Sequence, residues 1–338
     1  MKKRVLLRAD GSQRIGFGHL YRVFALAENL KANFNCLLVT SHINELVINE
    51  TKRLDISIIN VSHFEYTLPN ERTSTQEVPF DMESILEKDD IVIIDGYWFG
   101  IEYQNEIKKR GCFLICIDDL TTGEFNVDAI INHAPGIQAT NYHEGVQTKL
   151  YLGLDYMILR PSFFKNINKN REATKSIYLS FGGSDFYGLS LKFLKMCLKA
   201  TSQFKIHLLT SSSFQNDLIN ELSELRKEND ERVFLHQNLN GAEISDLIDK
   251  CTHAITASST VALEVVARGI KPLIGYYSDN QKNIYNGLIN EGLAYGAGNL
   301  LNCDNLSITD YLQSIVYSER QFNNKKLMGI FDFAMQQK

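Results

Sequence analysis

The chain has 338 residues, of which 44% are hydrophobic and 22% charged, so it can bury more than one domain core. A net charge of -5 offers no general attraction for a nucleic-acid backbone or an anionic membrane surface, so we expect neither as a partner. The sequence contains no apolar run long enough to span a membrane. Its amino terminus has too few apolar residues for a signal peptide. These features predict a soluble, cytoplasmic protein. The six cysteines show no metal-ligand spacing and are interpreted as reduced core thiols.

Short β-rich runs alternate with longer helical patterns, which predicts an α/β fold with parallel sheets covered on both faces. In the first half we expect strands at Val5–Leu7, Cys36–Val39, Ile56–Ile59, Ile91–Ile94, Phe113–Ile117 and Ala129–Ile131. A helix is expected from Gly18 onward, because apolar residues then recur at helical spacing along one face.

The second half repeats this pattern after a polar stretch that begins near Leu159. Strands are expected at Ile177–Phe181, Phe204–Leu209, Val233–Leu235, Ala254–Ala257 and Pro272–Tyr276, with helices near 190–200, 214–228, 242–250, 261–268 and 279–291. We therefore expect two Rossmann-like doubly wound domains, at 1–165 and 172–305, facing a cleft. A helical segment at 306–338 is expected to pack back on the first domain.

Ligands of such sheets bind beyond the carboxyl ends of the strands, so loops that follow strands hold the candidate site residues. Gly16 and Gly18 follow the first strand and permit close backbone approach. His19 lies in the first turn of the next helix, where the helix dipole favours a neutral imidazole that can accept a proton. The alternative is an ordinary exposed loop histidine. A dinucleotide site is disfavoured because Tyr21 replaces the third glycine of GxGxxG.

In the second domain, SFGGSD at 180–185 and ASSTVALE at 257–264 each join a strand to a helix and suit a diphosphate. We expect UDP contacts from Gly182, Gly183, Ser184, Ser258, Ser259, Thr260 and Glu264. Helix capping is the alternative for Ser184 or Asp185 and for the Thr260 and Glu264 pair. Asn280 and Gln281 follow another strand, and their neutral side chains suit sugar hydroxyl or acetamido groups. A helix cap through Ser278 is the alternative there.

Acidic residues follow two further strands of the first domain. Asp95 and Tyr97 come after one strand, and the Asp118–Asp119 pair comes after the next. A strand-end turn is the more frequent role for such a pair, with a metal site or a carboxyl of raised pKa as alternatives. No Asp-x-Asp, Walker A, G-x-S-x-G or H-E-x-x-H motif is present. We expect neither a metal nor a cofactor.

In this order the motifs resemble one family, the UDP-2,4-diacetamido-2,4,6-trideoxy-β-L-altropyranose hydrolases of pseudaminic acid biosynthesis. The resemblance covers about residues 4 to 295. It is carried by R-A-D-x₄-I-G-x-G-H-x-x-R at 8–22, D-x-Y at 95–97, D-D at 118–119, N-H at 132–133, L-R-P at 159–161, S-F-G-G-S-D at 180–185, S-S-x₄-E at 258–264 and N-Q at 280–281.

The resemblance implies a glycosyltransferase-B fold and transfer of the sugar to water, with His19 as the catalytic residue. It also implies that Tyr97 and Asn280 lie near the sugar and that Ser258, Ser259 and Glu264 lie near the UDP. We add Asp10, Gly16, Gly18, Arg22 and Gln281 as substrate-binding residues. We expect a monomer or a weak homo-oligomer. A glycosyltransferase of the same fold and a non-catalytic UDP-sugar binding protein are the two alternatives.

Overall fold

The structure is a computed structural model that describes residues 2–12, 15–65, 77–142, 148–167, 175–183, 185–211, 213–314 and 316–336. The chain divides into two compact units. Unit 1 contains residues 1–161 and 323–338, and unit 2 contains residues 162–322. The expected segment 306–338 is therefore divided, because its first part belongs to unit 2 and its last part to unit 1.

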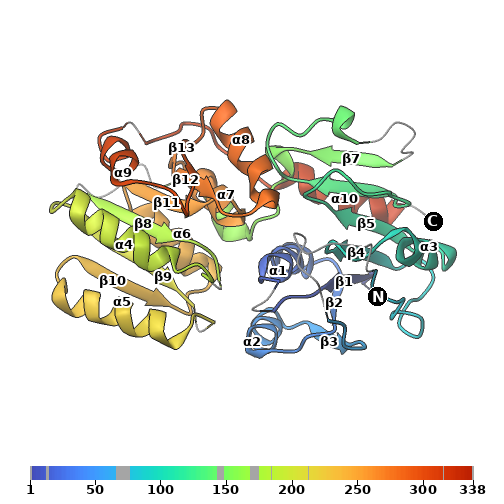
Figure 1. Cartoon of the computed structure of the whole chain (residues 1–338). Coiled ribbons are helices and arrows are strands. Elements are labelled where there is room, and N and C mark those ends of the chain that lie inside the picture. The colour runs from blue at the N-terminus through green and yellow to red at the C-terminus, as the bar shows by residue number, and fades with distance from the viewer. Residues whose placement is uncertain are drawn as a thin grey trace. The chain divides into compact units, whose positions relative to one another are not determined.

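Unit 1 is built on a parallel sheet with the strand order β3-β2-β1-β4-β5-β6-β7 (Figure 1). Its strands are β1 (Arg4–Ala9), β2 (Asn35–Thr40), β3 (Ser57–Asn60), β4 (Ile91–Asp95), β5 (Phe113–Ile117), β6 (Ala129–Asn132) and β7 (Lys149–Leu152). Its α-helices are α1 (Gly18–Leu30), α2 (Glu45–Leu54), α3 (Ile101–Lys109) and α10 (Lys325–Gln336).

Alternate residues of these strands enter two separate cores, which is why the strands read as continuous apolar runs. Val5 and Leu7 of β1 join a core with α1 and α10, whereas Leu6 joins the opposite core with α3. The sheet of unit 1 is thus covered on both faces.

Unit 2 repeats the design with a parallel sheet in the order β10-β9-β8-β11-β12-β13. Its strands are β8 (Ser176–Ser180), β9 (Lys205–Thr210), β10 (Val233–Gln237), β11 (His253–Ala257), β12 (Leu273–Tyr276) and β13 (Tyr295–Asn299). Its α-helices are α4 (Leu189–Ala200), α5 (Asn216–Glu228), α6 (Gly241–Lys250), α7 (Thr260–Ala267), α8 (Lys282–Asn290) and α9 (Asn305–Tyr311). The prediction of an α/β chain with two Rossmann-like sheets is confirmed.

Two strands were not predicted, β7 and β13, and each lies at an edge of its sheet. In both sheets the strand order reverses beside the first strand, between β1 and β4 and between β8 and β11. Such a reversal is where loops at the carboxyl ends of strands separate and leave room for a ligand.

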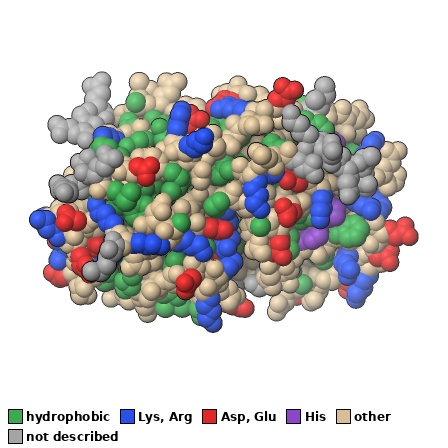
Figure 2. Space-filling model, turned by 180° about the vertical axis from the view of Figure 1, so that it is seen from behind, with side chains coloured by type: hydrophobic (Ala, Val, Ile, Leu, Met, Phe, Trp, Pro, Cys, Tyr) green, Lys and Arg blue, Asp and Glu red, His purple; other side chains and the backbone are tan. Residues whose placement is uncertain are grey.

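The distribution of charged and apolar side chains agrees with the composition. Basic and acidic side chains are interspersed with uncharged ones over the face shown in Figure 2. None of the helices in the described residue ranges has both the length and the apolar composition needed to span a bilayer.

Candidate functional site

Four acidic residues of unit 1 lie at one edge of the sheet because of the strand register. Ala9 at the end of β1 pairs with Asp95 of β4, and Asp95 pairs with Ile117 at the end of β5. Asp10 and the Asp118–Asp119 pair directly follow these strands. The helix α1 begins at the same edge, eight residues beyond Asp10, and brings His19 to it.

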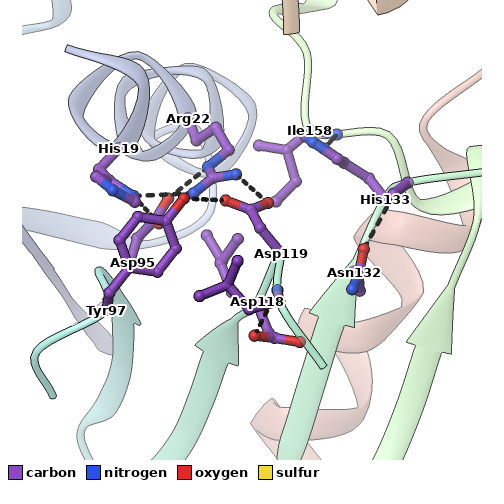
Figure 3. Close-up of polar contacts among 12 residues, drawn as sticks. His19, Arg22, Asp95, Tyr97, Asp118, Asp119, Asn132, His133 and Ile158 are labelled. Atoms are coloured by element: carbon purple, nitrogen blue, oxygen red, sulfur yellow. Dashed lines mark hydrogen bonds and ion pairs between the residues drawn. The ribbon is translucent and has the colours of Figure 1, made fainter. Parts of the chain in front are cut away.

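His19 is buried and its ring nitrogen Nδ1 lies 2.7 Å from Asp95 Oδ1 (Figure 3). A carboxylate only accepts hydrogen bonds, so the contact with Asp95 favours the tautomer with its proton on Nδ1. The same Nδ1 also lies 2.9 Å from a terminal nitrogen of Arg22, which can only donate. In the tautomer protonated on Nδ1, the lone pair of a neutral His19 resides on Nε2. Asp95 thus orients the His19 ring, as the carboxylate of a catalytic triad does for its histidine.

Arg22 follows His19 by one helical turn and binds two carboxylates. Its Nε and one terminal nitrogen donate to Asp95 over 2.8 and 2.6 Å, and its other terminal nitrogen donates to Asp119 over 2.5 Å. Burial opposes the charge on Arg22, but Asp119 and Asp95 outweigh it and raise the pKa of Arg22 well above its usual value. Burial likewise opposes the charge on Asp119, but Arg22 lowers the pKa of Asp119 to about 2.

Tyr97 completes this group from the loop after β4. Its hydroxyl donates to Asp119 over 3.1 Å, and its ring meets that of His19 edge to face with centroids 4.9 Å apart (Figure 3). His19, Arg22 and Tyr97, three residues proposed from the sequence, therefore meet around Asp95 and Asp119. We call these five residues the His19 cluster.

Asp10 and Arg22, both expected to bind substrate, each have several protein partners. Asp10 is buried and accepts hydrogen bonds from Arg8, from the Thr40 hydroxyl and from the backbone and hydroxyl of Ser41. Asp10 therefore joins the loops that follow β1 and β2. Arg22 holds two carboxylates and is placed to orient His19.

The two glycines of the first motif differ in conformation. Gly16 has a φ of +81°, a value that glycine adopts readily, and its carbonyl accepts from the Ser12 backbone. Gly18 begins α1, and no side chain caps that helix start at Phe17.

The sequence did not single out Asp119 as a partner of Arg22, nor His133 as a neighbour of the cluster. His133 is buried beyond β6, and its Nδ1 accepts from the Ile158 backbone (Figure 3). Burial, reinforced by Arg22, lowers the pKa of His133 to about 4 and keeps its imidazole neutral. The available signal was that acidic residues and an Asn-His pair end three neighbouring strands, β4, β5 and β6.

In unit 2 the loop after β8 contains Gly182, with a φ of +98°, and Gly183. Ser184 lies outside the described residues. The Asp185 carboxylate is buried and accepts from the backbones of Leu189 and Ser190, so Asp185 caps the start of α4. Diphosphate binding and helix capping were the two roles considered for the Ser184–Asp185 pair, and the Asp185 side chain caps the helix.

The loop after β11 begins α7. Ser258 is buried and its hydroxyl donates to the Gly275 carbonyl of β12. Ser259 caps α7 by accepting from Val261, and Thr260 is the first helical residue. Glu264 lies one turn further along α7 and is half-buried. The start of this helix therefore offers a positive dipole end beside hydroxyl groups.

The loop after β12 carries the two expected sugar-binding residues. Gln281 is buried and its Oε1 accepts from the Tyr277 backbone, while Asn280 accepts from the Ser278 hydroxyl. Because β8, β11 and β12 are adjacent, their three loops lie at one edge of the sheet. Unit 2 thus brings together the loops that hold its expected site residues.

The chain has the glycosyltransferase-B fold. It is similar over 99% of its length to the crystal structure of Acinetobacter baumannii MurG, at a TM-score of 0.60 and 12% identity over 99% of that chain. It is also similar over 99% of its length to TcCGT1 in complex with UDP, at a TM-score of 0.62 and 11% identity over 93% of that chain. Identities this low establish the fold alone.

In sequence, the chain is 26% identical over 271 residues to the UDP-2,4-diacetamido-2,4,6-trideoxy-beta-L-altropyranose hydrolase of Campylobacter jejuni, covering 78% of this chain and 88% of that protein. It is 26% identical to an uncharacterized protein of Methanocaldococcus jannaschii, covering 83% of this chain but only 57% of that protein's length. It is 27% identical over 55% of its length to the Bacillus subtilis spore coat polysaccharide biosynthesis protein SpsG, over 52% of that protein. No protein-family model matches the sequence.

Proposed function

We propose that this chain is a hydrolase that releases UDP from a UDP-2,4-diacetamido-2,4,6-trideoxyhexose. The observation that carries the proposal is the 2.7 Å contact between His19 and Asp95, which orients the ring and, in the tautomer protonated on Nδ1, leaves the lone pair on Nε2. A base held in this way suits the activation of water. The similarity to the Campylobacter jejuni hydrolase supports the choice of substrate class.

In the proposed reaction a water oxygen attacks the anomeric carbon from the face opposite UDP. His19 Nε2 takes one proton of this water, the new C–O bond forms, and the bond from the anomeric carbon to the phosphate oxygen breaks with inversion. Asp95 stabilises the imidazolium that forms. UDP leaves with the bonding electron pair and needs no strong acid, because a diphosphate is a stable anion at neutral pH.

Unit 2 supplies the nucleotide contacts in this proposal. The loop at Gly182–Gly183 and the start of α7 at Ser259–Thr260 bind the diphosphate, and Glu264 accepts the ribose hydroxyls. Asn280 and Gln281 bind the sugar, together with Tyr97 of unit 1. We place the reaction in the biosynthesis of pseudaminic acid or a related nonulosonic acid, in the cytoplasm.

A glycosyltransferase is the second candidate, and the similarity in fold to MurG favours it. His19 would then deprotonate an acceptor hydroxyl in the same way as it would a water. The test is to incubate the purified chain with the UDP-sugar and no acceptor, and to follow UDP by chromatography and the free sugar by NMR. Stoichiometric release of UDP and sugar supports the hydrolase. UDP release only after an acceptor is added supports the transferase, and UDP binding without turnover of either kind supports a binding protein.

The bond that breaks is tested separately with ¹⁸O-labelled water. The proposed attack at carbon places the label in the sugar, which mass spectrometry detects. Label in the phosphate of UDP means attack at phosphorus and excludes the proposed role of His19.

A further inference from the structure

Two aromatic side chains of unit 2 are exposed to solvent in a tight turn. Phe186 is 70% exposed and Tyr187 is 53% exposed, although both are large rings. They occupy the central positions of the turn in which the Gly188 backbone donates to the Asp185 carbonyl over 2.9 Å. Turn centres favour Gly, Asn, Asp, Ser or Pro, so two exposed aromatic residues there have no explanation in local folding.

Hydrogen bonds hold the backbone of the turn that carries these rings. The buried Asp185 carboxylate accepts two backbone hydrogen bonds of 2.8 Å from the start of α4, and Asp185 and Gly188 both have positive φ values. A fixed backbone presents an aromatic ring at low entropic cost, which is what a binding surface requires.

The rings lead directly to the loop after β12. Phe186 and Tyr187 lie edge to face with centroids 5.2 Å apart, and Tyr187 lies 5.5 Å from Tyr277. The Tyr277 backbone donates to Gln281, one of the two residues proposed to bind the sugar. Because β11 lies between β8 and β12, the contact between Tyr187 and Tyr277 joins the loops on either side of the strand that leads to α7.

We propose that Phe186 and Tyr187 contact the sugar of the nucleotide-sugar and favour sugars that carry methyl-bearing groups in place of hydroxyls. This inference rests on the proposed function, since it assigns the nucleotide to the loops beside α7. The Tyr187 ring packs against Tyr277, whose backbone donates to Gln281, whereas Glu264, the proposed ribose ligand, lies one turn inside α7. Acetamido methyl groups and a 6-deoxy methyl group pack well on aromatic faces. A hydroxyl in the same place loses its hydrogen bonds to water and gains none from the rings.

The test is isothermal titration calorimetry in the His19→Asn background, which removes turnover during the titration. The variant Phe186→Ala/Tyr187→Ala is titrated with UDP, with the UDP-diacetamidotrideoxyhexose and with UDP-N-acetylglucosamine. We expect affinity for the diacetamido compound to fall about 10-fold and affinity for UDP-N-acetylglucosamine to fall less, because a pocket methyl contributes about 10- to 200-fold. Affinity for UDP should stay within about 2-fold, since UDP has no sugar to contact the rings.

Two controls accompany this test. Leu306→Ala removes an apolar side chain of the same unit that is 71% exposed, and should change no affinity. Tyr187→Phe keeps the ring and should retain affinity for the sugar. Circular dichroism verifies that each variant folds.

Two outcomes overturn the inference. Equal losses for UDP and the UDP-sugars would place the rings against the nucleotide, and unchanged affinities would mean that the rings do not contact the ligand. A failure of the proposed function gives a different result, namely no release of UDP by the unmodified chain while the calorimetric differences remain.

Discussion

The candidate residues of unit 1 and unit 2 lie at the carboxyl ends of similar sheets but use different chemistry. In unit 1, Arg22, Asp95 and Asp119 are charged, buried and bound to one another around His19. In unit 2, the loops after β8, β11 and β12 offer glycine backbone, hydroxyl groups and neutral amides. The first arrangement can orient a proton acceptor, and the second can bind an anion through backbone N–H and hydroxyl groups while the buried Asp185 carboxylate caps α4.

Because their chemistry differs, we expect the two units to respond differently to substitution. Changes in the His19 cluster should lower the rate with little effect on nucleotide affinity, because the interactions that they remove act in the transition state. Changes at the residues of unit 2 proposed to bind the diphosphate and ribose should weaken nucleotide binding and leave the rate at saturation nearly unchanged.

The largest effect is expected for His19→Asn. Loss of the base should lower kcat by about 10²- to 10⁴-fold, while affinity for UDP stays within about 2-fold. UDP release and calorimetry measure the two quantities. His63→Asn, at an exposed histidine of the same unit, is the matched control and should leave both unchanged. Near-normal turnover by His19→Asn would remove this residue from the mechanism.

Asp95→Asn comes next. The amide can donate as well as accept, so the contact no longer favours a proton on Nδ1, and we expect kcat to fall about 10²-fold. Asp119→Asn is the comparison, because it removes the other carboxylate from Arg22 and leaves the contact between His19 and Asp95 in place. Its effect should be about 10-fold or less. Equal losses in the two variants would show that orientation of His19 by Asp95 has no separate role. Thermal unfolding of both variants checks their stability.

Gly182→Ala probes the backbone of unit 2. Apart from its two chain neighbours, none of the residues that the structure describes has an atom within 4 Å of the added methyl group, but the φ of +98° strains any residue with a side chain. A strain of about 1–3 kcal/mol predicts roughly a 10-fold loss of UDP affinity, with kcat at saturating substrate changed little. Gly329→Ala in α10 is the control and should stabilise the chain by about 0.5–1 kcal/mol. A loss confined to kcat would contradict the division of roles.

The smallest effect concerns pH and stability. His133 has a pKa of about 4 in the folded chain, below the value of about 6.5 in an unfolded one. The unfolded chain therefore binds a proton first, so the free energy of unfolding falls as pH drops from about 6.5 towards 4. The free energy of unfolding is higher at pH 7.5 than at pH 5, and His133→Asn should make this difference about 2 kcal/mol smaller. Urea unfolding at the two pH values measures it, and an unchanged difference would show that His133 does not titrate in this way.

Much of the fold was predictable because buried parallel strands have a clear sequence pattern. Strands such as β1 and β4 are largely apolar on both faces, and each is followed by an amphipathic helix. The two strands that were missed are edge strands with weaker patterns. Residues of β7 are half-buried or exposed, and β13 contains Gly296 and Gly298, which lower its strand propensity.

The candidate site was predictable only in part. Glycines, hydroxyl residues and His19 after strands were found because their positions follow from the strand pattern. The partners of Arg22 were not found, since Asp95 and Asp119 lie 73 and 97 residues away in sequence. The sequence allows two roles for Asp185, and only the contacts with Leu189 and Ser190 show that it caps the helix.

The sequence by itself determined the alternation of strands and helices, the two doubly wound sheets and the strand ends at which polar residues cluster. These properties depend on residue periodicity and on backbone preferences, which are local. Only the tertiary structure decided which charged groups meet, namely that Asp95 orients His19 and that Arg22 holds two carboxylates. Such pairs form or fail over differences of about 1 Å between atoms, and strand register and core packing set those distances.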